Sequence, residues 1–141
     1  MDNMGAVVGY RQKVPESEKV TINLGYVDLG HIDLLVEEGF FSNRSDFIRT
    51  AIRSQIDRHN GTLKQSVARR HLELGLRHYG RSELEAVKAA GETLHIRALG
   101  LVIIDSDVSP DLALATIASI DVLGALQASA EVKSVLSARM R

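Results

Sequence analysis

Six residues near the start of the chain decide how its first part folds: Lys19-Val20-Thr21-Ile22-Asn23-Leu24. Apolar and polar side chains alternate strictly, so Val20, Ile22 and Leu24 point to one side. This period of two predicts a half-buried β-strand. A six-residue strand is not stable alone, and no second strand lies nearby in the sequence. We therefore expect it to pair antiparallel with the same strand of a second copy of the chain.

Two helices are predicted after this strand. Apolar residues recur at three- and four-residue spacing over Val27–Glu38, which predicts a helix that Gly39 ends in a left-handed conformation. A second helix is predicted from about Arg44 to Arg58. Asn43 is a good N-cap for it, and the carboxylate of Asp46, three residues on, can reach back in the manner of a capping box.

The start of the second helix carries the most specific motif, Phe41-Ser42-Asn43-Arg44-Ser45-Asp46-Phe47-Ile48-Arg49-Thr50-Ala51-Ile52-Arg53. It resembles the ribbon-helix-helix family of the MetJ, Arc and CopG type, whose CopG-like members read [FY]-x-[SN]-R-S-[DE]-x-I-R-x-A-[IL]-R. With the strand and first helix, the resemblance covers residues 18–58, about 30% of the chain. Gly25 departs from it, because many relatives have Pro there.

The resemblance implies binding to double-stranded DNA by a two-stranded ribbon in the major groove. The outward side chains of the ribbon suit base reading, since Asn pairs with adenine, Lys with guanine, and Thr offers a hydroxyl and a methyl group. The expected base contacts are Lys19, Thr21 and Asn23. The expected phosphate contacts are Ser42, Asn43, Arg44 and Ser45, with arm contacts from Arg11 and Lys13. A solvated strand face and an ordinary helix cap are the plainer alternatives.

Three similar segments occupy the second half of the chain. Leu-Gly-Leu or Leu-Gly-Ala recurs 25 and then 24 residues apart, and each copy lies in an apolar run that precedes a serine helix cap. The runs are Leu72–Tyr79, Leu94–Ile104 and Ile117–Ala128, and the caps are Ser82, Ser109 and Ser129. This predicts three strand–helix units, either stacked as repeats or arranged as an ordinary α/β domain with Leu-rich strands.

The expected fold class is α+β: an N-terminal ribbon-helix-helix dimerisation and DNA-binding module, then a small C-terminal α/β domain of about three strand–helix units. Residues 1–18 are expected to form a flexible arm and residues 19–60 the module, whose second helix Asn60-Gly61 would end. Residues 61–70 form a linker or a short helix. Residues 71–141 form an oligomerisation or sensor domain.

Composition excludes several classes of protein. The 141 residues include no cysteine, which excludes disulfides, cysteine-based zinc sites and thiol nucleophiles. Five histidines occur without a His-x-His pair, and no catalytic motif is visible, so we expect no metal, no cofactor and no enzyme activity. No apolar run approaches a membrane span, which predicts a cytoplasmic protein with no membrane partner, nucleoid-associated when bound to DNA.

The slightly acidic charge of the predicted DNA-binding part favours an oligomer larger than a dimer. The net charge is −1, and residues 1–60 hold seven Lys and Arg against nine Asp and Glu. We therefore expect modest DNA affinity per dimer, helped by tetramers or larger species formed through the C-terminal domain.

The leading hypothesis is a sequence-specific DNA-binding transcriptional repressor that acts as a homodimer or higher oligomer. One alternative is an antitoxin, in which the C-terminal part would block a toxin; antitoxin tails are commonly short and polar, whereas Leu72–Met140 reads as a folded core. Another is a structural or interaction protein that uses the ribbon-helix-helix module only to dimerise.

Overall fold

The computed structural model describes residues 17–141, which divide into two compact units. The first unit extends to Ser54 and the second is Gln55–Arg141. The expected arm, residues 1–18, lies almost wholly outside the described residues, as do Arg11 and Lys13 within it.

The first unit holds one helix and most of a second, and both helices are predicted by the sequence. Helix α2 is Tyr26–Glu37, and Gly39 follows with φ of 85°, the predicted left-handed stop. Helix α3 is Arg44–Arg58. The side chain of Asn43 caps it, since its Oδ1 accepts a hydrogen bond from the amide of Asp46 at 2.8 Å. The Asp46 carboxylate reaches back one residue further than a capping box requires, to the amide of Ser42 at 2.9 Å.

The strand expected over residues 19–24 is not formed in the single chain. Residues 17–25 have neither helical nor strand hydrogen bonding, although Gly25 itself is extended, with φ of −66° and ψ of 153°. The physical reason is that a strand needs a partner for its backbone N–H and C=O groups, and none of the described residues supplies one.

The stretch after α3, for which the sequence allowed a linker or a short helix, is helical. Helix α3 ends at Arg58 as predicted, but helix α4, Asn60–Arg70, begins after the single residue His59. The His59 amide donates to the Ile56 carbonyl at 3.0 Å, and its own carbonyl accepts from the amide of Leu63 at 2.9 Å. These bonds make a helical turn more favourable than a loop, so residues 61–70 are a helix and not a linker.

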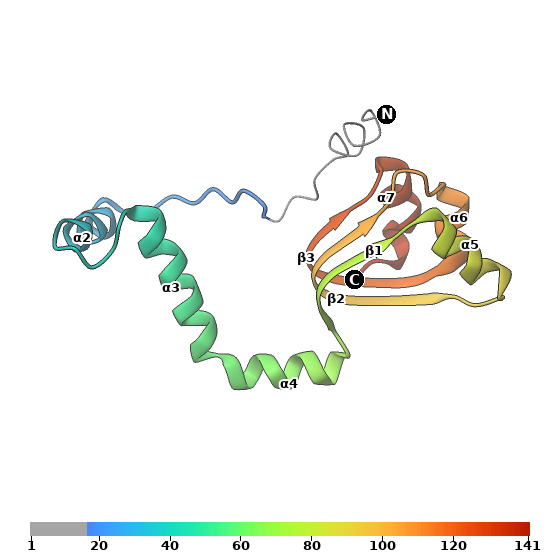
Figure 1. Cartoon of the computed structure of the whole chain (residues 1–141), viewed down its shortest axis with the longest axis horizontal. Helices are drawn as coiled ribbons and strands as arrows, with labels where there is room; N and C mark the ends of the chain where they lie inside the picture. The colour runs from blue at the N-terminus through green and yellow to red at the C-terminus, as the bar shows by residue number, and fades with distance from the viewer. Residues whose placement is uncertain (1–16) are drawn as a thin grey trace, which may run out of the picture. The chain divides into compact units, whose positions relative to one another are not determined.

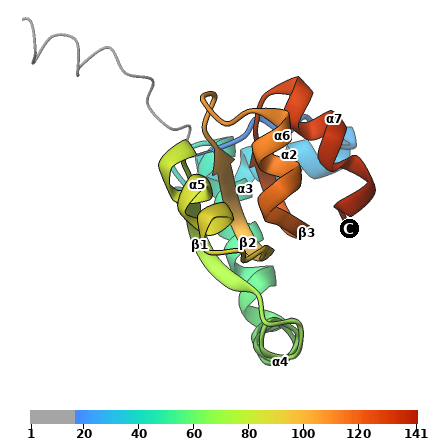
Figure 2. The same cartoon turned by 90° about the vertical axis from the view of Figure 1, so that its right-hand side faces the viewer.

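The second unit contains the three predicted strand–helix units. Strands β1 (Glu73–Tyr79), β2 (Leu94–Ile104) and β3 (Ile117–Gln127) pair in parallel in that order, and each is followed by a helix. The helices are α5 (Arg81–Ala89), α6 (Pro110–Thr116) and α7 (Ala130–Leu136), with a short 3-10 turn η1 (Ser137–Arg139) at the end. Figure 1 shows the strands lying together in sequence order, and Figure 2 shows the helices in a row on one side of them.

Two of the three predicted serine caps are confirmed. The hydroxyl oxygens of Ser109 and Ser129 accept hydrogen bonds from the amides of Leu112 at 3.1 Å and Val132 at 3.2 Å. The expectation for Ser82 is wrong, because α5 begins at Arg81, two residues earlier than a cap at Ser82 would place it. Its N-cap is Gly80, which has no side chain to bond with.

The repeated glycines form one row across the sheet. Gly100 pairs with Gly75 on one side and with Gly124 on the other. All three have positive φ, at 112°, 142° and 121° in chain order, a region that residues with side chains rarely adopt. A Cβ atom on Gly100 would lie 2.2 Å from the carbonyl oxygen of Gly75. Figure 1 shows the strands curving around the core, and the glycine row allows this path with the backbones in close contact.

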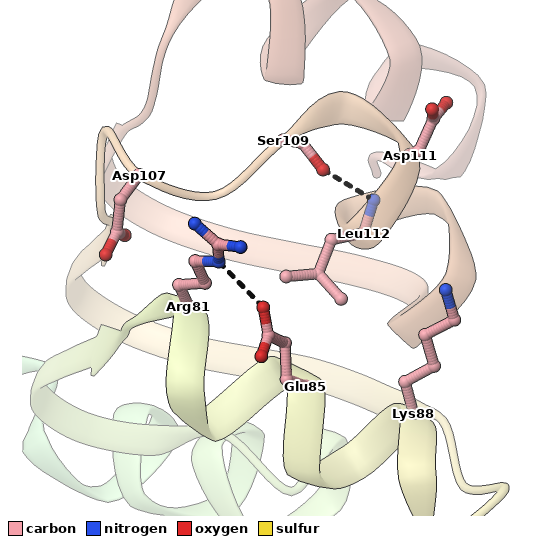
Figure 3. A pocket seen from close by; sticks show the side chains of 7 residues that line it. All are labelled: Arg81, Glu85, Lys88, Asp107, Ser109, Asp111 and Leu112. Atoms are coloured by element: carbon pink, nitrogen blue, oxygen red, sulfur yellow. Dashed lines mark hydrogen bonds and ion pairs between the residues drawn. The ribbon is translucent and has the colours of Figure 1, made fainter.

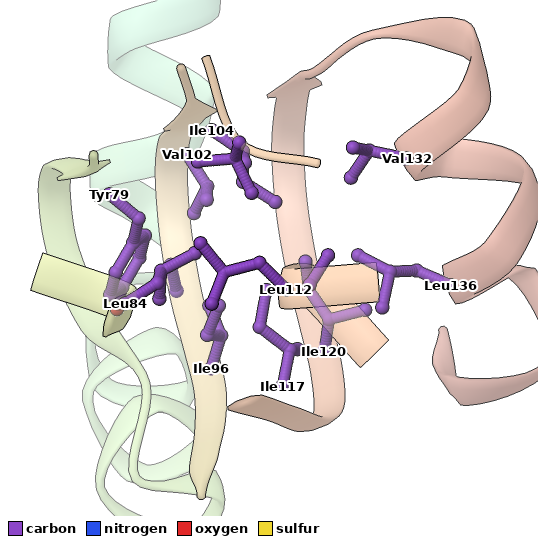
Figure 4. Packing of buried hydrophobic residues seen from close by; sticks show 13 residues of the cluster. Tyr79, Leu84, Ile96, Val102, Ile104, Leu112, Ile117, Ile120, Val132 and Leu136 are labelled. Atoms are coloured by element: carbon purple, nitrogen blue, oxygen red, sulfur yellow. The ribbon is translucent and has the colours of Figure 1, made fainter. Parts of the chain in front are cut away.

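One core occupies the helix side of the sheet (Figure 4). Alternate residues of β2 contribute to it, namely Ile96, Ala98, Val102 and Ile104, all no more than 3% exposed. The helices pack against these residues with fully buried side chains: Leu84 from α5, Ala113 from α6, and Val132 and Leu136 from α7. The opposite face of the sheet carries the intervening residues, and several of its leucines are exposed.

Two arginines donate hydrogen bonds to polar groups at the margin of this core. Arg70 donates to both carboxylate oxygens of Asp121, at 3.1 and 3.0 Å, which provides a partner for a carboxylate on a residue only 8% exposed. Arg139 donates to the carbonyls of Leu114 and Ile117, both at 2.7 Å. These carbonyls lie at the end of α6, where the helix leaves such groups without a partner.

We predict that Gly100→Ala destabilises the second unit, because the added Cβ meets the Gly75 carbonyl and the backbone is in a strained region. The strain alone should cost about 1–3 kcal/mol. The control is Gly61→Ala, within α4 and with no atom within 4 Å of its Cβ, which should be neutral or slightly stabilising. Urea unfolding of both variants checks this; equal stability would contradict it.

Candidate nucleic-acid interface

The turn before α3 gathers the four residues expected to contact phosphate. Ser42, Asn43, Arg44 and Ser45 follow one another at the start of the helix, and all are exposed. The turn is braced by Phe41 and Phe47, whose rings meet edge to face with centroids 5.0 Å apart. The four polar residues are therefore presented together on a supported turn.

The backbone of this turn offers two donors that have no acceptor among residues 17–141. The amides of Arg44 and Ser45 occupy the first helical positions, where no intrahelical acceptor exists. The amides of Ser42 and Asp46 are already bonded to side chains within the turn. Free amides at the positive end of a helix dipole form a favourable environment for a phosphate group.

The side chain of Arg44 has a partner that sequence reasoning missed. It forms a two-pronged ion pair with Asp33 of α2, at 2.8 Å from Nε to Oδ1 and 2.9 Å from Nη2 to Oδ2. The hydrogen bond from Arg44 holds the pKa of the Asp33 carboxyl below its ordinary value, and the carboxylate in turn raises the pKa of Arg44. Both side chains are half exposed, so the pair joins α2 to α3 while remaining open to competition by another anion.

Asp33 carries no signal in the sequence that marks it as this partner. It lies 11 residues before Arg44, and the contact exists only because the turn at Gly39 brings α3 back beside α2.

The three expected base-contacting residues lie on the extended segment before α2. Lys19, Thr21 and Asn23 are all exposed. So are the apolar residues between them, with Val20 at 78% and Ile22 at 61% exposure. The chain alone therefore does not distinguish a polar outer face from a covered apolar face in this segment.

The first unit has almost no core of its own. Within residues 17–54, Ile32 is the one buried apolar side chain, at 5% exposure. Large apolar residues elsewhere in this range stay open to solvent, including Tyr26, Val27, Leu34, Phe40 and Ile52. The first unit thus leaves most of its large apolar side chains in solvent.

A cavity of about 370 Å³ lies in the second unit between α5 and the start of α6 (Figure 3). Its lining is mainly charged, with Arg81 and Lys88 facing an excess of acidic groups, Glu85, Asp107 and Asp111. Arg81 is bonded to Glu85 at 2.7 Å, and the Ser109 hydroxyl is taken by the α6 cap. Glu85 is therefore already paired, while Asp107 and Asp111 keep the lining acidic overall.

Residues 17–141 contain no group of three or more His, Cys, Asp or Glu side chains placed to hold a metal ion. In the same range, none of the helices has the length and apolar character needed to cross a membrane.

Comparison with known proteins agrees with the resemblance seen in residues 18–58. Residues 15–133 match the model of the Ribbon-Helix-Helix transcriptional regulator family. A curated relative, Transcriptional regulator CdrS of Halobacterium salinarum, is 40% identical over 42 residues, which is 30% of this chain and 76% of the relative. No solved structure matches the chain. The family match spans β1, β2 and β3, so it includes the second unit as well as the first.

We predict that Arg44→Gln raises the pKa of the Asp33 carboxyl toward its ordinary value, because the hydrogen bond that lowers it is lost. In the wild-type protein the stabilisation from this pair is present at neutral pH and disappears as the pH falls through the lowered pKa of Asp33. Carboxyl NMR titration measures the pKa directly. Arg49→Gln, on the same helix, is the control and should leave Asp33 unchanged; an unchanged Asp33 in both variants would refute the pairing.

Proposed function

Because the chain belongs to the ribbon-helix-helix transcriptional regulator family, we propose that it is a sequence-specific DNA-binding repressor that acts as a homodimer. The observation that carries this proposal is the alternating segment Lys19–Leu24, with Val20 and Ile22 exposed, in a unit whose residues 17–54 bury one apolar side chain. Such a unit requires a partner, and a second copy supplies both a strand and apolar cover. DNA is then its only partner apart from itself, and no catalysis or cofactor is involved.

Two antiparallel copies of Lys19–Leu24 would bury Val20 and Ile22 on the helix side. Lys19, Thr21 and Asn23 of each copy would then share the outer face, which fits the major groove. These residues read bases, while the turn from Ser42 to Ser45 clamps the phosphate backbone on either side. Arg11 and Lys13 add contacts from the arm.

Arg44 must leave Asp33, at least in part, to contact a phosphate. The pair is exposed and uses two of the guanidinium nitrogens, so the exchange of one anion for another costs little.

The C-terminal domain assembles these dimers into tetramers or larger species, which supplies the avidity that a first unit with more acidic than basic residues needs. The folded second unit also favours a regulator over an antitoxin with a tail that orders on its toxin. The protein would act in the cytoplasm, associated with the nucleoid.

We predict that Ile22→Pro prevents dimerisation of the first unit, because proline removes a ribbon hydrogen bond and the apolar side chain. Ile22 is exposed in the single chain, so the fold of each chain should survive. Ile22→Val is the control and should dimerise normally. Formation of the ribbon is measured by cross-linking the two strands through Thr21→Cys, introduced into each variant. Cross-linking that persists in Ile22→Pro would refute this pairing.

We further predict different effects on DNA binding from Asn23→Ala and Arg44→Ala, measured on sites that the wild-type protein selects from random duplexes. Asn23→Ala should relax preference at one base position by about 1–3 kcal/mol. Arg44→Ala should weaken binding to all sequences alike and flatten its salt dependence. Arg49→Ala is the control, because it removes the same charge from a position on α3 outside the turn. Uniform weakening by both Asn23→Ala and Arg44→Ala would overturn the assignment of reading and clamping residues.

A further inference from the structure

The sheet of the second unit ends in two edges of matching shape. Strand β1 uses one edge to pair with β2, and within the described chain its other edge has no backbone partner. Strand β3 is paired with β2 on one side. On its outer side, Ile120 is the one residue bonded within the described part of the chain, through a bridge to Met140 and the amide of Arg141 at 3.0 Å. Residues 122–127 of that outer edge have no partner within residues 17–141.

The unpaired part of the β3 edge matches β1 in length and in the register at which β1 would pair with it. Ala98 of β2 pairs with Glu73 on one side and with Val122 on the other. A strand equivalent to β1, laid beside β3 in the same pattern, would therefore place Glu73 opposite Val122 and Gly75 opposite Gly124. The seven residues of β1 would cover the part of β3 that Met140 and Arg141 leave free.

At Gly75 the β1 edge has the same backbone conformation as β2 and β3 have at Gly100 and Gly124, where each strand contacts the strand before it. A Cβ on Gly124 would lie 2.1 Å from the carbonyl oxygen of Gly100, and one on Gly100 would lie 2.2 Å from that of Gly75. Gly75 has the same kind of backbone, with φ of 112°, but the space where its Cβ would lie is empty. That space corresponds to the carbonyl oxygen of a glycine in a strand before β1.

The open face of the sheet supports the same arrangement. Leu74 and Leu76 on β1 are 68% and 54% exposed, and Leu123 on β3 is 42% exposed. Leu99 and Leu101 on the central strand, which has neighbours on both sides, are better covered. A strand added at each edge would give the outer leucines the neighbours that Leu99 already has, and would pair edge groups that are otherwise open to unwanted association.

We propose that the β1 edge of one chain pairs in parallel with the β3 edge of a second copy, with Gly75 opposite Gly124. The contact joins two different surfaces, so it is head-to-tail and leaves a free β1 edge and a free β3 edge at the ends of each stack. It repeats a packing that the chain already contains twice. The inference rests on the higher assembly proposed above and does not depend on any DNA contact, so the two can be tested apart.

The test is a double variant of the full chain, Leu74→Cys with Leu123→Cys, in a protein that has no other cysteine. Within one chain these positions are separated by β2, about 10 Å at two strand spacings, beyond the roughly 7 Å that a disulfide can bridge. In the head-to-tail pair they become direct neighbours, about 5 Å apart. Both side chains are exposed, so the fold should not suffer.

The expected result after mild oxidation is a ladder of covalent trimers, tetramers and larger species on a denaturing, non-reducing gel. Each single variant should remain largely monomeric, and an equal mixture of the two single variants should stop at the covalent dimer. Leu74→Cys with Leu99→Cys, which are paired within one chain, is the control that shows the bond can form across parallel strands.

Two results would overturn the proposal. Efficient covalent dimers from either single variant would mean that like surfaces meet, as in a two-fold packing of the open faces. Absence of the ladder while the Leu74–Leu99 control cross-links would mean that the two edges do not meet. DNA binding by the variants is measured separately. Absence of the ladder with intact DNA binding would refute the pairing of the β1 and β3 edges and leave the proposed DNA binding unaffected.

Discussion

The close approach of backbone to backbone at Gly75, Gly100 and Gly124 is the constraint on which the second unit depends. A side chain at Gly100 or Gly124 would occupy the place of a carbonyl oxygen on the strand before it. The positive φ at each position lets the strands curve together, which brings both ends of each strand toward the same helices. The core, with Leu84, Val132 and Leu136 fully buried, forms inside that curve.

The two units obtain stability in different ways. The second unit buries a continuous core within one chain, whereas residues 17–54 bury Ile32 alone among their apolar side chains. The ion pair between Asp33 and Arg44 orients α2 against α3, but an exposed pair contributes little to stability. The first unit therefore keeps most of its apolar surface open to solvent, including Val20 and Ile22 of the alternating segment, which has no strand partner within residues 17–141.

Local patterns were enough to predict most of the elements. The bounds of α3 and β2 follow from apolar spacing and from the cap at Asn43, and the recurrence of Leu-Gly predicts the three units. Ser109 and Ser129 were recognisable as caps, but Ser82 was misleading because Gly80 already ends β1 in the extended conformation a cap requires. The partner of Arg44 and the glycine row arise from chain folding over longer distances, which spacing alone does not encode. The base and phosphate contacts remain predictions.

The short separation between paired strands also bears on how the second unit forms during synthesis. Each strand pairs with the one about 24 or 25 residues before it, so every pairing closes a short loop and the contacts stay local in sequence. The sheet can grow one strand at a time as the chain emerges from the ribosome. The carbonyls of Leu114 and Ile117 at the end of α6 gain their partner only later, because Arg139 follows them in the chain by 25 and 22 residues.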